Sequence, residues 1–345
     1  MEDLMTWGAN VIVALQQIPW LLAAMQSVTW LGSEEFFLLV MPALYWCVNR
    51  RLGLGLAVVL ITSNALNGLF KLALHLPRPY WIDPRVRALS SETTYGLPSG
   101  HAQHAAAVWG YLASQAARVR PALAWALALV LIGLISFSRV YLGMHFPLDV
   151  AGGWLIGAGL LSVFWRWQAP ATAWLGRLGL AQQLLVAVLA SAAFAVLAGG
   201  ALFAASGTPD PAAWAAHAAA TQVEPIDPRS PENVATAAGM LLGLGAGLAL
   251  AQRYARFEAG GPWGKRLARF AIGVVGMLLF WRGLALVFPA GSEALPLALR
   301  YVRYALTVVW ALALAPWLFV RLGLATEESD RPHVTAPVAA GPAQP

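Results

Sequence analysis

Three short clusters of basic residues, histidines and one carboxylate lie at the ends of apolar segments of the 345-residue chain. They are Lys71 with Arg78, then Ser99–Gly100–His101, then Arg139 with His145 and Asp149. Charged side chains beside membrane-length apolar segments are costly in free energy, and they commonly mark functional sites. The clusters therefore predict one polar site assembled from three separate loops.

The cations Lys71, Arg78 and Arg139 predict a pocket for a doubly charged anion. The planar guanidinium group offers two parallel N–H donors that match the oxygens of a phosphate. Ser99 and Gly100 stand at the expected start of a helix, where free backbone N–H groups and the helix dipole attract an anion. We therefore expect these five residues to bind phosphate.

The third cluster predicts an activated nucleophile. Asp149 follows His145 by four residues across a turn, so its carboxylate can hold one ring nitrogen and leave the other basic. His101 is then free to protonate the leaving oxygen as a general acid. The expected reaction is phosphoryl transfer through a phosphohistidine that water hydrolyses. We expect no metal and no cofactor, because the cations themselves neutralise the transition-state charge.

The order and spacing of the clusters resemble the signature of the type 2 phosphatidic acid phosphatase superfamily, which also contains vanadium haloperoxidases and glucose-6-phosphatase. The matching patterns are Lys71-x6-Arg78-Pro79, Pro98-Ser99-Gly100-His101 and Ser138-Arg139-x5-His145-x3-Asp149. The resemblance covers roughly residues 36–168, and it implies the same phosphate-binding and catalytic roles for the residues above. It offers no counterpart for the C-terminal third of the chain.

The segments that must position these residues are apolar and long. The chain is 59% hydrophobic and 11% charged, which excludes an ordinary soluble protein. Candidate spans lie at about 36–48, 53–74, 101–118, 121–141, 148–168, 180–204, 234–252, 267–288 and 297–320. Residues 8–31 fit an interfacial amphipathic helix slightly better than a span. We therefore expect an all-α polytopic membrane bundle of about nine or ten transmembrane helices.

The distribution of basic residues predicts the orientation of the bundle. Arginines and lysines gather on alternate loops, which the positive-inside rule places in the cytoplasm together with the C-terminus. The loops 75–100, 139–147, 205–233 and 289–296 then face outward. This predicts a multi-pass protein of the cell inner (plasma) membrane, with its site on the periplasmic or outer side.

Four regions are expected along the chain. Residues 1–34 form an N-terminal interfacial or membrane helix, and residues 35–170 form the catalytic membrane core. Residues 175–322 add further transmembrane helices, and residues 323–345 form a disordered tail, since they are rich in proline and alanine.

Three arginines in the added helices suggest a second anionic lipid site. Arg282 falls inside an apolar run, and Arg300 and Arg303 open the next span at a similar depth. Side chains that snorkel to the interface are the slightly favoured alternative. Both interpretations stay open from the sequence.

The expected substrate is a lipid phosphate or diphosphate, either a polyprenyl diphosphate or a phosphatidate-like lipid, because a site at helix ends favours amphiphiles. The expected partners are this substrate and membrane lipids. Nucleic acid is not expected despite a net charge of +6, because the basic residues are scattered. The oligomeric state is open. Alternatives are a lipid phosphotransferase, or a lipid-binding or transport protein built on the same core.

Overall fold

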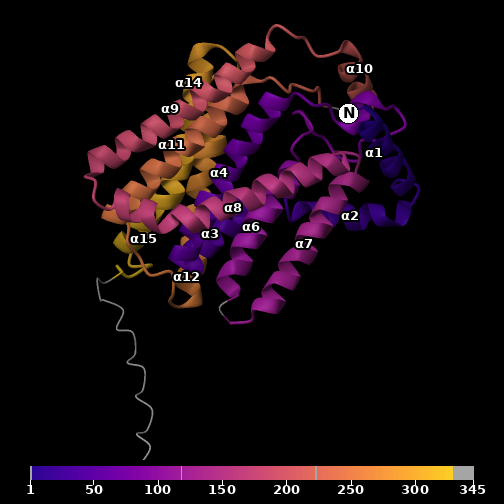
Figure 1. The fold of residues 1–345 in the computed structure, drawn as a ribbon. Coiled ribbons are helices and arrows are strands. Elements are labelled where there is room, and N and C mark those ends of the chain that lie inside the picture. Colours follow the sequence, from indigo (N-terminus) through magenta and orange to yellow (C-terminus); the bar gives the residue numbers. More distant parts are fainter. Residues whose placement is uncertain (1, 118, 222–223, 329–345) are drawn as a thin grey trace, which may run out of the picture.

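The computed structural model describes residues 2–117, 119–221 and 224–328, and within these residues the chain is almost entirely helical. Figure 1 shows the helices gathered in one bundle, with the C-terminal helices beside the N-terminal ones. In the described residues, β-structure is represented by one isolated antiparallel bridge between Phe257 and Glu327. The predicted all-α class is confirmed.

The first half of the chain supplies the helices that carry the sequence clusters. They are α1 (Glu2–Leu15), α2 (Leu22–Trp30), α3 (Glu34–Cys47), α4 (Arg50–Leu74), α5 (Pro79–Ile82), α6 (Gly100–Ala116), α7 (Pro121–Tyr141) and α8 (Pro147–Leu175). Proline begins α5, α7 and α8, where its missing N–H costs nothing. Side chains of Ser33, Asn49 and Ser99 cap α3, α4 and α6.

The second half of the chain adds helices that pack against the first. They are α9 (Leu180–Ala205), α10 (Ala212–Thr221), α11 (Pro231–Tyr254), α12 (Trp263–Leu278), α13 (Leu284–Val287), α14 (Ala294–Val309) and α15 (Ala315–Arg321). One-turn π-helical stretches, Leu279–Gly283 and Trp310–Leu314, join α12 to α13 and α14 to α15.

Among the described residues, seven helical segments are long and apolar enough to cross a membrane, or eight if one bent pair counts as a span. They overlap the predicted segments 53–74, 121–141, 148–168, 180–204, 234–252, 267–288 and 297–320, but not 36–48 or 101–118. The predicted count of nine or ten is not confirmed, because α3 has 14 residues and α6 has 17. A straight helix of that length is shorter than the roughly 20 residues that a bilayer core requires.

The N-terminal region is broken into two pieces. Residues 2–15 and 19–30 pass the length and hydropathy test only together, and they meet at an angle of 86°. Such a pair is either a broken span or a re-entrant segment, so one straight interfacial helix over 8–31 is not what the structure contains. The two N-terminal pieces pack on α5, which directly follows Arg78, and on α7, which carries Arg139.

The hydrophobic core joins the two halves of the chain. The hydroxyl of Tyr45 and the indole N–H of Trp46, both in α3, donate to the carbonyls of Leu312 (2.7 Å) and Ala311 (2.9 Å). Both aromatic side chains are fully buried, and they pack with Phe319 in one cluster. The added helices are therefore part of the same packed body as the N-terminal half of the chain.

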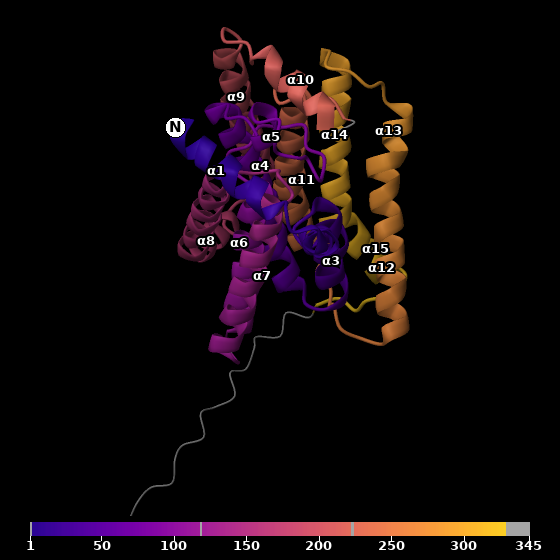
Figure 2. The same ribbon diagram turned by 90° about the vertical axis from the view of Figure 1, so that its right-hand side faces the viewer.

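Figure 2 shows α5, α10 and the connection from α13 to α14, which belong to loops predicted to face outward, in the upper part of the bundle. The amide of Asp227 donates to the carbonyl of Thr93 at 3.0 Å, which ties loop 205–233 to loop 75–100. The short helix α10 lies over α5, where the rings of Trp214 and Trp81 stand 5.8 Å apart. The orientation of this end in the membrane stays a prediction.

The start of the predicted disordered tail is ordered. The amide of Glu258 donates to the carbonyl of Thr326 at 3.0 Å, and Glu328 forms an ion pair with Arg50 at 2.9 Å. Residues 323–328 were expected in the tail because of their composition, but the loop between α11 and α12 gives them hydrogen-bond partners. Residues 329–345 lie outside the described residues.

Candidate active site

The first cluster lies where α4 ends and α5 begins. Lys71 is in the last turn of α4, and its carbonyl accepts from the amide of His75, whose φ is +52°. This left-handed residue reverses the chain, which then runs extended to Arg78, directly before Pro79 begins α5. The reversal brings Arg78 back toward Lys71.

The second cluster is fixed at the N-terminus of α6. The Ser99 hydroxyl accepts from the amide of Ala102 at 3.5 Å, and the Ser99 amide donates to the carbonyl of Asp149 at 2.9 Å. The side-chain amide of Asn67 in α4 donates to the carbonyl of Pro98 (3.2 Å) and to the Gln103 side chain (3.0 Å). Helices α4 and α8 thus hold the start of α6 from two sides.

The third cluster depends on a tight turn after α7. Gly143 has φ +76°, and a Cβ atom there would meet the carbonyl oxygen of Arg87, so glycine is required. The amides of Met144 and His145 both donate back to the carbonyl of Arg139, at 3.0 and 3.3 Å. The turn therefore explains the five-residue spacing, because it returns His145 to the end of α7 beside Arg139.

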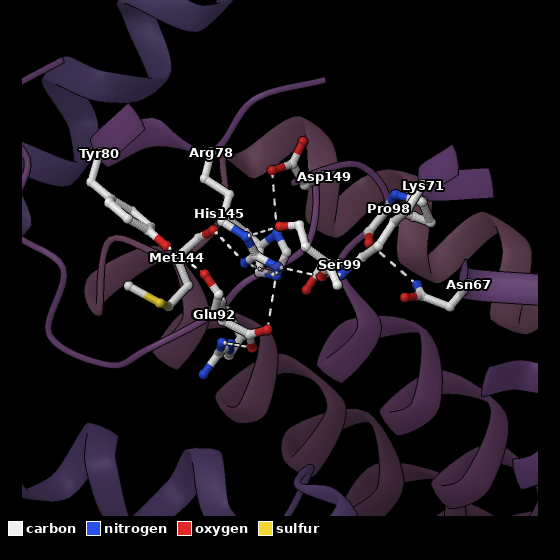
Figure 3. A network of polar contacts seen from close by, with 12 residues as sticks. Asn67, Lys71, Arg78, Tyr80, Glu92, Pro98, Ser99, Met144, His145 and Asp149 are labelled. Carbon is white, nitrogen blue, oxygen red and sulfur yellow. Dashed lines mark hydrogen bonds and ion pairs between the residues drawn. The ribbon is translucent and has the colours of Figure 1, made fainter. Parts of the chain in front are cut away.

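The imidazole of His145 is held between Asp149 and Arg78 (Figure 3). Its Nδ1 lies 3.3 Å from Oδ2 of Asp149, and the same oxygen accepts from the amide of Phe146 at 2.9 Å. Its Nε2 lies 3.2 Å from Nη1 of Arg78. Because a guanidinium can only donate, this arrangement places the proton on Nδ1 and the lone pair on Nε2.

The surroundings of His145 keep the ring neutral. Burial lowers its pKa well below the usual value, and the nearby cations Arg78, Arg139 and Lys71 lower it further. His101 contributes in the same direction, so the two histidines lie within electrostatic range. A neutral imidazole with an unprotonated Nε2 is the form that a nucleophile needs.

All three predicted phosphate-binding cations are buried in the same region. Lys71 is 8% exposed, Arg78 0% and Arg139 1%. Thr94 binds two of these cations, because its hydroxyl accepts hydrogen bonds from Nζ of Lys71 at 2.8 Å and from Nη2 of Arg78 at 3.2 Å. Arg139 donates to the hydroxyl of Thr29 in α2 at 3.0 Å.

The sequence analysis missed Glu92, which lies at the centre of this cluster. Its Oε1 is 2.7 Å from Nη2 of Arg139, and its Oε2 is 3.3 Å from Nη2 of Arg78. Burial alone would raise the pKa of Glu92, but Arg78, Arg139 and Lys71 hold it well below its usual range. The carboxylate therefore bridges two arginines in the way expected of a substrate phosphate.

Replacing Glu92 with glutamine tests whether the carboxylate and an anion compete for the two arginines. The variant leaves two buried cations without a charged partner, so we expect its melting temperature to fall. Orthovanadate should then bind the variant about tenfold more tightly, because a charge-assisted hydrogen bond is worth about 1.5–3 kcal/mol.

The measurement is thermal unfolding in detergent across an orthovanadate titration. Vanadate should raise the melting temperature of the variant more than that of the wild type. Asp83→Asn is the matched control, because Asp83 pairs with the exposed Arg85 in the same loop. Equal vanadate effects on Glu92→Gln and wild type would contradict competition.

A second polar network ties the C-terminal region to the loop that carries Thr94. The Tyr95 hydroxyl lies 2.9 Å from Oδ2 of Asp210, and Arg229 donates to both Tyr95 (2.7 Å) and Asp210 (2.7 Å). Burial, opposed by Arg229 and aided by Asp210, raises the pKa of Tyr95 to about 12, so its hydroxyl stays protonated. Asp210 and Arg229 therefore fix the residue next to Thr94.

A double-mutant cycle on Tyr95→Phe and Asp210→Asn tests this link. Each single change should lower kcat several-fold, because Thr94 orients Lys71 and Arg78. The pair should show a coupling free energy of about 0.5–3 kcal/mol, the range for residues that share one hydrogen-bond network. Additive effects on both kcat and thermal stability would mean that the network does not act on the site.

The remaining predicted residues stand as follows. His101 is in the first turn of α6, half-buried. Arg300 pairs with Glu232 at 2.5 Å, while Arg282 stacks on Trp281 and Arg303 lies over the Tyr304 ring. A lipid site at these arginines stays a prediction.

Among the described residues, no three histidine, cysteine or acidic side chains are grouped to hold a metal.

Two family models match the chain. Residues 52–173 match the model described as PAP2 superfamily, and residues 235–327 match the PAP2 superfamily phosphatase, transmembrane extension. The chain therefore belongs to the PAP2 superfamily. The C-terminal helices, for which the sequence motifs offered no counterpart, match the second model.

Curated relatives agree with this assignment. Glucose-6-phosphatase 3 of Bos taurus is 35% identical over 186 residues, covering 46% of this chain and 53% of its own length. Phosphatidylglycerophosphatase B of Bacillus subtilis is 31% identical over 152 residues (40% and 71%), and undecaprenyl-diphosphatase of Sulfolobus acidocaldarius is 34% identical over 113 residues (32% and 52%). The chain thus spans about half the length of the glucose-6-phosphatase 3 that it matches.

Proposed function

We propose that this protein is a membrane phosphatase that hydrolyses a lipid phosphate or diphosphate through a phosphohistidine at His145. One observation carries the proposal. The Nε2 lone pair of His145 points at Arg78, inside a cluster of three buried cations, while Asp149 holds Nδ1. A site that only bound an anion would not need an oriented imidazole.

The proposed reaction has two steps. Nε2 of His145 attacks phosphorus, and the leaving oxygen takes a proton from His101. His101, now neutral, removes a proton from water, which attacks the phosphohistidine and releases inorganic phosphate. Lys71, Arg78 and Arg139 stabilise the charge on the phosphoryl oxygens in both steps, and the N-terminus of α6 adds backbone N–H donors.

The substrate is proposed to be amphiphilic and to reach the site from the outer leaflet. The site residues lie on or next to helices that are long and apolar enough to span a membrane. The names of two relatives, an undecaprenyl-diphosphatase and a phosphatidylglycerophosphatase, support a lipid substrate. The outward orientation rests on the distribution of basic residues.

The test is phosphate release by the detergent-purified protein in EDTA. The panel contains undecaprenyl diphosphate, phosphatidate, phosphatidylglycerol phosphate, sphingosine phosphate and glucose 6-phosphate. Release from a lipid that persists in EDTA supports the proposal, and the ranking names the substrate class. Release from glucose 6-phosphate alone would overturn the lipid assignment. A phosphorylated acceptor without free phosphate would make the protein a phosphotransferase.

A further inference from the structure

A small apolar cavity lies beside Lys71, between the catalytic half and the C-terminal helices. Its volume is about 40 Å³. Gly68 and Lys71 of α4 and Thr94 line one side, and Phe194 of α9 with Val234 and Ala237 of α11 line the other. Helices α4, α9 and α11 pack against one another in this part of the bundle (Figure 1).

The cavity is continuous with the phosphate-binding cluster. Lys71 and Thr94 line the cavity and hydrogen-bond to each other at 2.8 Å, and Thr94 also accepts from Arg78. A phosphate bound to these cations therefore has the cavity as its neighbour. Apart from Lys71, Thr94 and Asn233, the cavity walls are apolar or glycine, which suits carbon atoms rather than a polar headgroup.

Gly68 keeps the cavity open. A Cβ atom at this position would have no other atom within 4 Å, so close packing does not require glycine here. Glycine in the interior of a helix is less favourable than alanine. The missing side chain leaves space directly against the backbone of α4, one helical turn before Lys71.

We propose that this cavity binds the hydrocarbon carbons next to the phosphate of the substrate, and that α9 and α11 thereby contribute to substrate specificity. The inference rests on the proposed function and extends it to the C-terminal region. A cavity of about 150 Å³ holds a benzene molecule, so this one accommodates about two carbon atoms. The cavity therefore contacts only the hydrocarbon next to the phosphate ester and not the whole lipid.

Filling the cavity tests the proposal. Gly68→Leu should lower kcat/KM for undecaprenyl diphosphate by about tenfold or more, since one methylene in an apolar pocket changes specificity by 10–200-fold. Inhibition by orthovanadate, which carries no hydrocarbon, should stay within about twofold of wild type. Gly200→Leu is the matched control, because Gly200 is exposed on α9 and its Cβ position is equally open.

A second variant removes side-chain volume instead. Phe194→Ala should shift the kcat/KM ratio between a branched polyprenyl phosphate and a straight-chain alkyl phosphate, again with vanadate inhibition unchanged. Unaltered lipid kinetics in both Gly68→Leu and Phe194→Ala would overturn the subsite. So would an equal loss of vanadate and lipid affinity, which would mean general damage to the site.

The two proposals fail in different ways. If the wild-type protein hydrolyses lipids and Gly68→Leu has the same lipid kinetics, only the subsite proposal is contradicted. If the wild type releases no phosphate, the proposed function fails, and stabilisation of the fold by undecaprenyl phosphate against melting replaces kinetics as the readout. If undecaprenyl phosphate stabilises the wild type but not Gly68→Leu, the subsite proposal is supported. If undecaprenyl phosphate does not stabilise the wild type either, the subsite proposal is overturned.

Discussion

Replacing His145 with alanine is expected to lower kcat by a factor on the order of 10⁴ or more, the scale seen when a covalent nucleophile is removed. The side chain is 1% exposed and provides the Nε2 lone pair that faces the buried cations. Alanine leaves Arg78, Arg139 and Lys71 in place, so orthovanadate should still bind. The measurement is phosphate release together with acid-quenched trapping of labelled phosphate on the protein.

His75→Asn is the matched control for this prediction. His75 lies between Lys71 and Arg78 in the sequence, and asparagine tolerates its left-handed backbone. This variant should keep activity within a few-fold of wild type and should still trap label. A His145→Ala protein that retains more than about one hundredth of wild-type activity would refute covalent catalysis at this residue.

Replacing Asp149 with asparagine is expected to have the second largest effect, a fall in kcat of about 10²–10⁴-fold. The Asp149 carboxylate orients the ring through Nδ1, and it faces the positive charge that the ring gains when Nε2 is phosphorylated. Asparagine keeps an oxygen for the amide of Phe146 but loses the charge. Single-turnover kinetics should show slower formation of the phosphoenzyme.

The stability of the variants separates chemistry from folding. Asp149→Asn preserves the hydrogen bond to Phe146 at the start of α8, so its melting temperature should stay close to wild type. Asp149→Ala removes that contact too and should melt earlier, since the loss of a helix cap costs about 0.5–2 kcal/mol. Wild-type kcat in the asparagine variant would show that the carboxylate does not assist His145.

The helical membrane fold and the three clusters were predictable because both depend on local pattern. An apolar run long enough to span a bilayer must be helical, since only a helix satisfies its own backbone there. The spacing of His145 and Asp149 fixes their contact within one turn. The span count was less predictable, because α3 and α6 fall short of a full bilayer length.

The residues that complete the site were not predictable. Glu92 and Thr94 belong to a loop without helical periodicity, and Asp210 lies more than a hundred residues from its partner Tyr95. Their roles depend on which distant groups the packed helices bring near them. Residues 323–328 likewise gained order only through the loop between α11 and α12.

The sequence by itself therefore determined the class of fold, the family and the candidate site residues, since these follow from side-chain type and short-range spacing. Only the tertiary structure decided how the cations are balanced and what the C-terminal helices contact. A buried charge requires a partner, and the partner that packing supplied for Arg78 and Arg139 is Glu92, from a different loop. Packing likewise placed α9 and α11 against the cavity beside Lys71, a contact that no motif records.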